Sequence, residues 1–382
     1  MIPYGRQSIS QGDIDAVTRV LNSPWLTQGP VVPQFETSVA AACGAEYAVA
    51  CNSATSALHL ACLALGVGPG DWVWTSPITF VASANCGLYC GAQVDFVDVD
   101  PASGNLCPLA LADKLVEAAK TGTLPKVIIA VHLCGHSCDM QALAHLTRRY
   151  GISLIEDASH GIGGHYKQQA IGSCYYSDIT VFSFHPVKII TAAEGGMATT
   201  NNAALAKTMS QLRSHGITKL SDEMNRPDEG DWYYEQQALG FNYRMTELQG
   251  ALGLSQLERL TEFVQQRNAL AEVYHQRLSQ LPLQWVDPLA GSVSARHLQM
   301  LRLDDPTLRR ALFDRLRGQD IQVHVHYYPV YLQPYYQQLG FMPGHCPNSE
   351  DFYRRILTLP LFPDMTTSQQ NWVCEALEAA LI

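Results

Sequence analysis

Short apolar runs and amphipathic stretches alternate along the first 250 residues. The apolar runs, which are typical of buried strands, cover residues 47–51, 72–75, 94–99, 126–132, 152–157, 178–184 and 196–200. Between them, the stretches with apolar side chains at spacings of three and four, the pattern of a helix packed on one face, are residues 53–65, 140–150 and 203–214. Strands that alternate with helices in this way predict a three-layer α/β domain with a mostly parallel sheet.

The pattern changes after residue 246. Residues 246–281 predict a long helical stretch, continuous or interrupted, which Pro282 closes. The elements expected after it are a strand at 297–303, a helix at 307–319, a strand at 322–328, an irregular stretch rich in Pro and Tyr, and a helix at 368–381. We therefore expect a large domain over residues 1–250 and a smaller α+β domain over residues 251–382, joined by the long helix.

Composition and charge narrow the class of protein. The chain has 382 residues, of which 47% are hydrophobic and 16% charged, so it is neither disordered nor fibrous. Its formal net charge is −10 and it has no dense basic patch, which argues against nucleic acid and anionic membranes as partners. Because it has no apolar run of roughly 18 residues and no signal-peptide pattern at Met1, we expect a cytoplasmic protein.

The eleven cysteines are scattered, and several lie in apolar helical stretches, where they act as small hydrophobic residues. One cluster combines His132, Cys134, His136 and Cys138. Cys-x3-Cys without a second pair is weak zinc spacing, so we expect a structural loop there and no metal site.

Three strand ends carry candidate chemistry, because ligands of open α/β sheets bind at the carboxyl ends of the strands. After residues 47–51, Ser53, Ala54 and Thr55 open a helix whose free N–H groups could hold a phosphate, although capping alone would also explain them. The strand at 152–157 ends in Asp157, whose carboxylate is costly to bury unless a cation or a donor meets it. A solvated strand end is the alternative.

Lys188 follows the strand at 178–184 and is one of seven lysines in the chain. It lies between Val187 and Ile189, where desolvation would lower its pKa and free the amine to attack a carbonyl. The alternative is a surface lysine that extends into solvent. A desolvated lysine, an acid and a phosphate-ready helix end are together what pyridoxal 5′-phosphate (PLP) requires, whereas a GxGxxG dinucleotide fingerprint is absent and a nicotinamide enzyme is disfavoured.

Three longer motifs carry a resemblance to a known family. They are Pro77-Ile-Thr-Phe-Val-Ala-Ser-Ala-Asn85, Ser183-Phe-His-Pro-Val-Lys188 and Gly240-Phe-Asn-Tyr-Arg-Met-Thr-Glu247. With them, the chain is similar nearly end to end to the sugar aminotransferases of the DegT/DnrJ/EryC1/StrS family. The resemblance implies a PLP-dependent type I fold, like that of aspartate aminotransferase. It also implies transamination, because family members that act as dehydratases have His in place of this lysine.

The resemblance also assigns roles at the cofactor. Lys188 would be the Schiff-base lysine, Asp157 the partner of the pyridine nitrogen, and His160 the partner of the phenolic oxygen, while Phe80, a Trp in several family members, would stack on the ring. The residues implied to hold the phosphate are Ala54, Thr55, Ser183 and, from the neighbouring subunit, Asn242. The last of these implies a homodimer with the active site at its interface.

For the substrates, the resemblance implies L-glutamate as amino donor and the 4-keto carbon of a UDP-linked sugar as acceptor, as in pseudaminic acid biosynthesis. The residues it places near the sugar nucleotide are Tyr4, Leu26, Thr27, His326 and Tyr327. Tyr328 and Tyr331 depart from the pattern of close relatives and leave the sugar open. Alternatives are a perosamine-synthase type of 4-aminotransferase and a non-catalytic regulatory protein, which the intact set of Lys188, Asp157, His160 and Ser183 disfavours.

Overall fold

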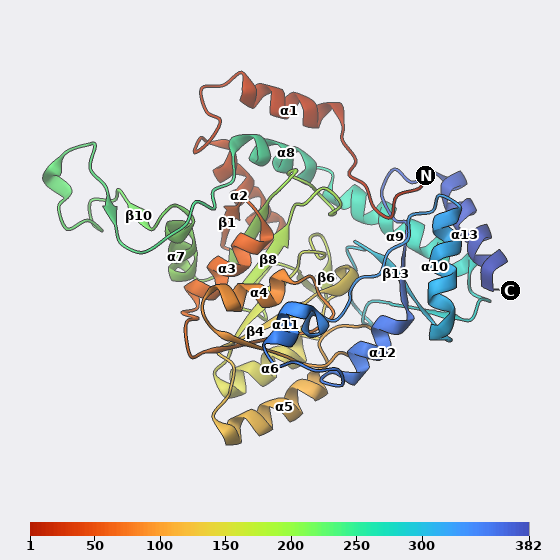
Figure 1. The fold of residues 1–382 in the computed structure, drawn as a ribbon. Coiled ribbons are helices and arrows are strands. Elements are labelled where there is room, and N and C mark those ends of the chain that lie inside the picture. Colours follow the sequence, from red (N-terminus) through yellow and green to blue (C-terminus); the bar gives the residue numbers. More distant parts are fainter. Residues whose placement is uncertain (382) are drawn as a thin grey trace.

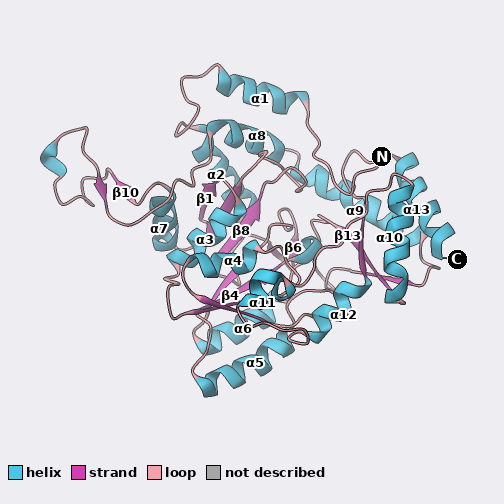
Figure 2. Ribbon diagram, in the orientation of Figure 1, coloured by secondary structure: helices cyan, strands magenta, loops and turns pink. Residues whose placement is uncertain are grey.

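The computed structural model describes residues 1–381, and a seven-stranded sheet forms its centre (Figures 1 and 2). In spatial order the strands are β1 (Tyr47–Cys51), β9 (Gly196–Thr200), β8 (Ile179–Ser183), β5 (Ser153–Asp157), β4 (Val127–Val131), β2 (Trp72–Thr75) and β3 (Gln93–Phe96). Only β9 runs antiparallel to its neighbours. The sheet is therefore mostly parallel, as predicted, and β1, β2 and β9 have the predicted bounds.

Helices cover both faces of this sheet. They are α2 (Val31–Cys43), α3 (Ala54–Ala64), α4 (Ala82–Tyr89), α5 (Pro108–Thr121), α6 (Met140–Tyr150) and α7 (Ala203–Arg213). Helix α1 (Gln11–Leu21) lies outside this layer and packs on α8 (Glu247–Leu257). Strand β4 shows how the layers form, since successive side chains of a strand point to opposite faces. Val127 and Ile129 join the core with α3 and α4, whereas Ile128 and Ala130 join the core with α5 and α6. This alternation gives the predicted three layers.

The C-terminal part has a second core of its own. It is built from α9 (Leu260–Arg277), β12 (Leu283–Trp285), β13 (Gln299–Leu303), α10 (Arg309–Gly318), β14 (Ile356–Leu359) and α13 (Thr367–Leu381). The three strands form an antiparallel sheet. The predicted division into residues 1–250 and 251–382 stays a proposal, and the separate cores support it.

The expected long helix is two helices, α8 (Glu247–Leu257) and α9. Helix α8 packs on α1 and α2, whereas α9 packs in the second core, so the chain bends between them. Arg259 lies at the bend and its guanidinium donates to Asp13 at the start of α1 at 2.5 Å.

One predicted strand, residues 322–328, is wrong. The structure has only one isolated bridge there, from His324 to Thr358, and another just before it, from Ile2 to Ile321. The alternation that suggested a strand has another cause: Val323 packs in the second core, while the segment from His324 onward lines a cavity. The stretch expected to be irregular holds α11 (Pro334–Gln338), α12 (Pro347–Arg355) and β14.

A long arm, residues 215–241, projects from the body beyond α7 (Figure 1). It contains the short strands β10 (Ile217–Thr218) and β11 (Glu235–Gln236) and exposes large apolar side chains such as Trp232 and Leu239. A further small hairpin joins β6 (His165–Tyr166) and β7 (Gln169–Ala170). Among residues 1–381, no helix combines the length and the apolar character that crossing a bilayer requires.

Candidate active site

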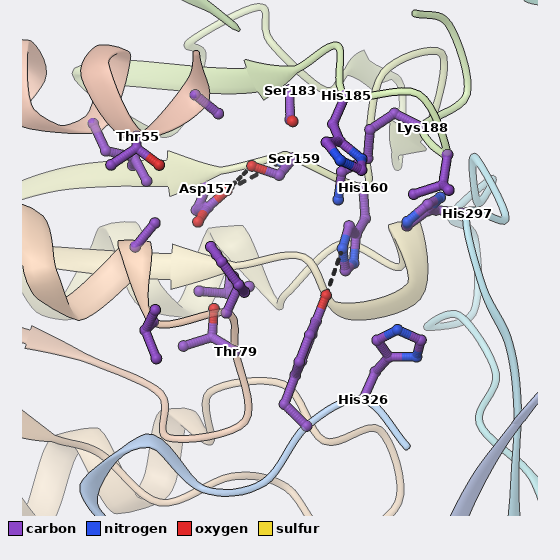
Figure 3. Close-up of a pocket in the computed structure, with 18 of the residues that line it drawn as sticks. Thr55, Thr79, Asp157, Ser159, His160, Ser183, His185, Lys188, His297 and His326 are labelled. Atoms are coloured by element: carbon purple, nitrogen blue, oxygen red, sulfur yellow. Dashed lines mark hydrogen bonds between the residues drawn. The ribbon is translucent and has the colours of Figure 1, made fainter. Parts of the chain in front are cut away.

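A cavity of about 670 Å³ lies at the carboxyl ends of the parallel strands, where the two cores meet. Its walls come from the ends of β4, β5 and β8, the start of α3, the segment after β2, the N-terminal segment and the loop at 324–328. Figure 3 shows Thr55 and Asp157 on one side, with His160, His185, His297 and Lys188 on the other. The cavity therefore brings together most of the predicted site residues.

Asp157 ends β5 and is almost fully buried. Its Oδ2 accepts a hydrogen bond from the Ser83 hydroxyl at 2.6 Å. Its Oδ1 accepts from the Ser159 hydroxyl at 2.6 Å and from the Ser159 N–H at 3.1 Å. These bonds stabilise a carboxylate that would otherwise be costly to bury, and they fix its direction toward the cavity.

Lys188 lies in a turn that follows β8. Its N–H donates to the carbonyl of His185 at 2.9 Å, and Ile189 and Ile190 beside it are buried in the core, which holds the turn in place. The amine forms no hydrogen bond or ion pair with residues 1–381. Burial lowers the pKa of Lys188 to about 8, although the nearby Asp157 carboxylate opposes the shift. About a tenth of this amine is thus uncharged at pH 7, far more than for an ordinary lysine with a pKa near 10.5.

The N-terminus of α3 presents backbone N–H groups to the cavity. Ser53 caps the helix, because its Oγ accepts from the N–H of Ser56 at 3.1 Å. The N–H groups of Ala54 and Thr55 have no acceptor in the described chain, and the Ser183 side chain lies at the same end of the cavity. Free amides at a helix N-terminus bind anions such as phosphate.

Gly196 allows this helix end to approach the sheet. A Cβ on Gly196 would lie 2.4 Å from the backbone nitrogen of Ala54 and 2.5 Å from the carbonyl carbon of Ser53. Only glycine therefore fits at the start of β9, where the strand touches the turn that leads into α3.

His160 contacts two cavity residues from the C-terminal part of the chain, Tyr327 and His297. Its Nε2 is 3.3 Å from the hydroxyl of Tyr327, and its ring lies 4.4 Å from that of His297. Burial, with the nearby Lys188, holds the pKa of His160 well below its usual range, so the ring is neutral. Its buried Nδ1 has no hydrogen-bond partner within residues 1–381, which is rare unless a bound group supplies one.

The outer wall carries Tyr4 and His326. The two rings are 5.3 Å apart, and His326 Nδ1 hydrogen-bonds the Thr358 hydroxyl at 2.9 Å. Phe80 also lines the cavity and is 59% exposed, so one face of its ring is free. Tyr328 and Tyr331, which depart from the pattern of close relatives, lie in different environments. Tyr328 lines the cavity, whereas Tyr331 is buried and its hydroxyl donates to Glu350.

Three predicted site residues lie outside the cavity of a single chain: Leu26, Thr27 and Asn242. Leu26 and Thr27 pair with the start of α8, and Asn242 pairs with Ser214 at the base of the arm. Their roles stay predictions.

The motif at 132–139 is a structural loop. His132 Nε2 donates to Glu156 Oε2 at 2.7 Å, while His132 Nδ1 accepts the N–H of Cys138. His136 bonds the Ser294 hydroxyl at 2.7 Å. In the part of the chain that the structure describes, no group of three or more His, Cys, Asp or Glu side chains could hold a metal ion.

Sequence reasoning missed three histidines of the cavity, His185, His297 and His324, as well as the serines that hold Asp157. His185 lies inside the motif that contains Lys188, and His297 opens the strand predicted at 297–303. The signal that could have identified them is a histidine next to the end of a predicted strand. Nothing in the sequence pairs His297 with His160, since 137 residues separate them.

Comparison with known proteins identifies the chain. The family model described as DegT/DnrJ/EryC1/StrS aminotransferase family matches residues 7–378. The chain belongs to this aminotransferase family. Its relatives include SpsC of Bacillus subtilis, a spore coat polysaccharide biosynthesis protein, which is 39% identical over 98% of this chain and 96% of its own length.

Solved structures of sugar aminotransferases share the whole fold. Helicobacter pylori PseC, an aminotransferase involved in the biosynthesis of pseudoaminic acid, superposes with a TM-score of 0.90 at 31% identity, covering 100% of this chain and 99% of that one. The PLP form of the putative sugar aminotransferase Spr1654 from Streptococcus pneumoniae gives a TM-score of 0.89 at 28% identity, covering 100% of each chain. The predicted type I fold, the aminotransferase class and the PLP dependence of the family are confirmed.

The cavity of this DegT/DnrJ/EryC1/StrS aminotransferase fits PLP on three observations of its own residues. The helix N-terminus offers two free N–H groups for a phosphate. A buried carboxylate, Asp157, is held by two serines and can keep a pyridine nitrogen protonated. The amine of Lys188 and the Nδ1 of His160 have no partner in the described chain, so both are available to a bound group.

Proposed function

We propose that this protein transfers the amino group of L-glutamate to the C4 keto carbon of a UDP-linked 2-acetamido-2,6-dideoxyhexos-4-ulose, a step of pseudaminic acid biosynthesis. The observation that carries the proposal is that Lys188 and Asp157 line the same cavity. The amine of Lys188 has no hydrogen-bond partner in the described chain, and its pKa is lowered. The likeness to PseC over the whole chain supports this sugar class. Eleven free cysteines fit a reducing compartment such as the cytoplasm.

The predicted cofactor residues keep their roles toward PLP in this proposal. Lys188 anchors the cofactor covalently, Asp157 faces the pyridine nitrogen and His160 the phenolic oxygen. The side chain of Phe80 covers one ring face, and the residues that hold the phosphate are Ala54, Thr55, Ser183 and Asn242 of the neighbouring subunit. When bound, PLP supplies an electron sink and carries the amino group between the two substrates.

Lys188 also moves the proton. It is the only lysine among the cavity-lining residues, and an amine with a pKa of about 8 can act as base and as acid near neutral pH. It takes the proton from the α-carbon of glutamate in the first half-reaction and delivers a proton to C4 of the sugar in the second. The two substrates therefore use one cavity in turn, and ping-pong kinetics are expected.

The acceptor sugar lies between the cofactor and the outer wall in this proposal, in contact with Tyr4, His326 and Tyr327. Tyr328 lines the same space and contributes to the choice of sugar. Leu26 and Thr27 contribute from the other subunit.

The active unit is a homodimer. The arm at 215–241 extends away from its own body and exposes Trp232 (80%) and Leu239 (84%), which favours burial against a second copy. Asn242 lies at the base of that arm, next to a surface that a second copy would cover.

An amino-transfer assay with glutamate and a panel of UDP- and GDP-linked 4-keto sugars tests the function. We expect turnover with the UDP-linked 2-acetamido sugar, and a loss of at least about a thousandfold in Lys188→Ala. Lys120→Ala, at an exposed lysine, is the control. Preference for a GDP-linked sugar would indicate the perosamine-synthase type, and full activity of Lys188→Ala would refute the proposed site.

A further inference from the structure

His324, a cavity residue without a role so far, lies at the outer wall of the cavity. We propose that its Nε2–H binds the diphosphate of the nucleotide-sugar substrate and so helps to select that substrate class. The inference rests on the proposed function, because it takes a nucleoside diphosphate sugar to be the acceptor.

The hydrogen bonds of His324 determine which nitrogen faces the ligand. The backbone N–H of Val325 points at His324 Nδ1 at 2.8 Å, closer than the 3.2 Å between Nδ1 and the Val325 carbonyl oxygen, and a proton on Nδ1 would clash with this N–H. Nδ1 therefore carries a lone pair, and in the neutral ring the proton is on Nε2. Nε2 has no partner in the described chain, so a donor is left free at the cavity wall.

Stacking fixes the direction of this donor. The rings of His324 and His326 are 4.5 Å apart and inclined by 25°, and Tyr4 packs at 5.6 Å from His324. His326 is itself held by Thr358. A ring that is packed on two neighbours and bonded at Nδ1 loses little freedom when Nε2 binds a ligand.

The depth of His324 favours the diphosphate over the donor amino acid. The reacting carbon of either substrate must reach Lys188, deep in the cavity. In a nucleotide sugar the diphosphate lies beyond the sugar ring, toward solvent, whereas glutamate is small. His326 is buried but its neighbour His324 is exposed, so His324 is at the solvent end of the same wall.

The charges that one chain places in the cavity favour such a donor. Its lining residues include one lysine and no arginine, and they also include the acidic Glu194 and Asp157. Burial, with the neighbouring His324, lowers the pKa of His326 to about 3, so that ring adds no charge. A charge-assisted N–H bond to phosphate oxygen is strong enough to matter for affinity.

The test measures binding of UDP to the PLP-loaded enzyme by calorimetry in four variants. His324→Ala should weaken UDP binding about tenfold. His324→Phe keeps the stacked ring without the N–H and should lose as much, whereas His324→Gln keeps an N–H near the same place and should retain most of the affinity. His145→Ala, at an exposed imidazole on α6, is the matched control.

A second readout separates the two substrates. The first half-reaction with glutamate, followed through the cofactor absorbance in a single turnover, should keep its rate in His324→Phe, while the KM for the sugar nucleotide rises. Unchanged UDP affinity in His324→Ala and His324→Phe would overturn the inference, as would a loss confined to the glutamate half-reaction. If UDP binds as expected but no 4-keto sugar is aminated, the proposed function fails and the donor assignment stands.

Discussion

Lys188 and Asp157 line the same cavity, and two effects act in opposite directions on the pKa of Lys188. The amine is desolvated by its surroundings, which favours the neutral form, while the carboxylate favours the ammonium. The hydroxyls of Ser83 and Ser159 donate to the two oxygens of the Asp157 carboxyl and hold it in place. The pair is thus balanced so that one amine can both accept and release a proton.

We predict that in the cofactor-free protein Lys188 titrates with a midpoint near pH 8, and that Asp157→Asn moves the midpoint lower because the attraction to the ammonium is lost. The pH dependence of acylation, measured by mass spectrometry of the peptide that contains Lys188, would show both. A midpoint that rises in Asp157→Asn would contradict the electrostatic account.

The same shift affects stability. Because folding lowers the pKa of Lys188 from 10.5 to about 8, the folded cofactor-free protein binds fewer protons than the unfolded chain between these values. The contribution of Lys188 to the free energy of unfolding therefore rises with pH across that window. Lys188→Met should remove this part of the pH dependence, as measured by urea unfolding at several pH values.

Glu156 precedes Asp157 on β5, and its hydrogen bonds stabilise this end of the strand. It accepts hydrogen bonds from His132 at 2.7 Å, Ser177 at 2.6 Å and Thr180 at 3.2 Å. Although burial opposes it, these bonds lower the pKa of the Glu156 carboxyl.

Glu156→Leu should lower the free energy of unfolding by about 3 kcal/mol, because it removes the acceptor of the buried His132 and Thr180 and of the partly buried Ser177. Glu156→Gln, which keeps one carbonyl acceptor, should cost less. Since a lowered carboxyl pKa stabilises the fold above pH 4.5 and loses that effect as the pH falls, the difference between wild type and Glu156→Leu should shrink in acid. Equal stability of wild type and Glu156→Leu at pH 7 would exclude this role.

At the scale of elements, the site depends on the contact between β9 and the start of α3. The strand runs antiparallel to its neighbours, so its first residue, Gly196, lies at the same edge as the carboxyl ends of β1 and β8. The absence of a side chain there places the free amides of α3 beside Ser183.

Gly196→Ala should weaken PLP binding by at least about tenfold and lower stability by about 1–3 kcal/mol, because the new methyl group would overlap backbone atoms. Fluorescence titration with PLP and thermal unfolding measure the two effects. Gly68→Ala, where a Cβ meets no atom within 4 Å, is the matched control and should change neither. Normal PLP affinity in Gly196→Ala would show that the helix end can move without loss.

Local pattern was enough to predict the sheet but not the outer wall. The continuous apolar run at residues 127–131 identifies β4, because parallel strands in the middle of a sheet are buried on both faces. Residues 322–328 carry the alternation of a strand, yet only tertiary packing decides that Val323 enters a core while His324 faces a cavity. For the same reason the motifs identified Lys188 and Asp157, whereas the contact of His160 with His297 had no sequence signal.

At the scale of the whole molecule, the proposed shared active site depends on the arm at 215–241 and on the predicted site residues that lie outside the cavity. Gly216 and Gly240 pack backbone on backbone at the base of the arm, where added Cβ atoms would clash, so the arm leaves the body at a fixed place. A fixed arm can deliver Asn242 to a second subunit.

We predict that Lys188→Ala and Asn242→Asp, each inactive alone, regain about a quarter of the wild-type activity when mixed and allowed to exchange subunits, because half of the dimers then contain one intact site. Analytical ultracentrifugation confirms the exchange, and the turnover of the mixture is the measurement. If Asn242 acted within its own chain, no intact site would form and the mixture would stay inactive.

The positions of the cavity residues along the sequence have a consequence for the synthesis of the protein itself. Thr55, Asp157 and Lys188 belong to the first half of the sequence, whereas His326 and Tyr327 come from its last sixty residues. On the ribosome, the groups that would capture the vitamin emerge well before these two residues of the outer wall. A polypeptide cut short before His326 would lack this part of the proposed acceptor wall while keeping every residue proposed to hold the coenzyme.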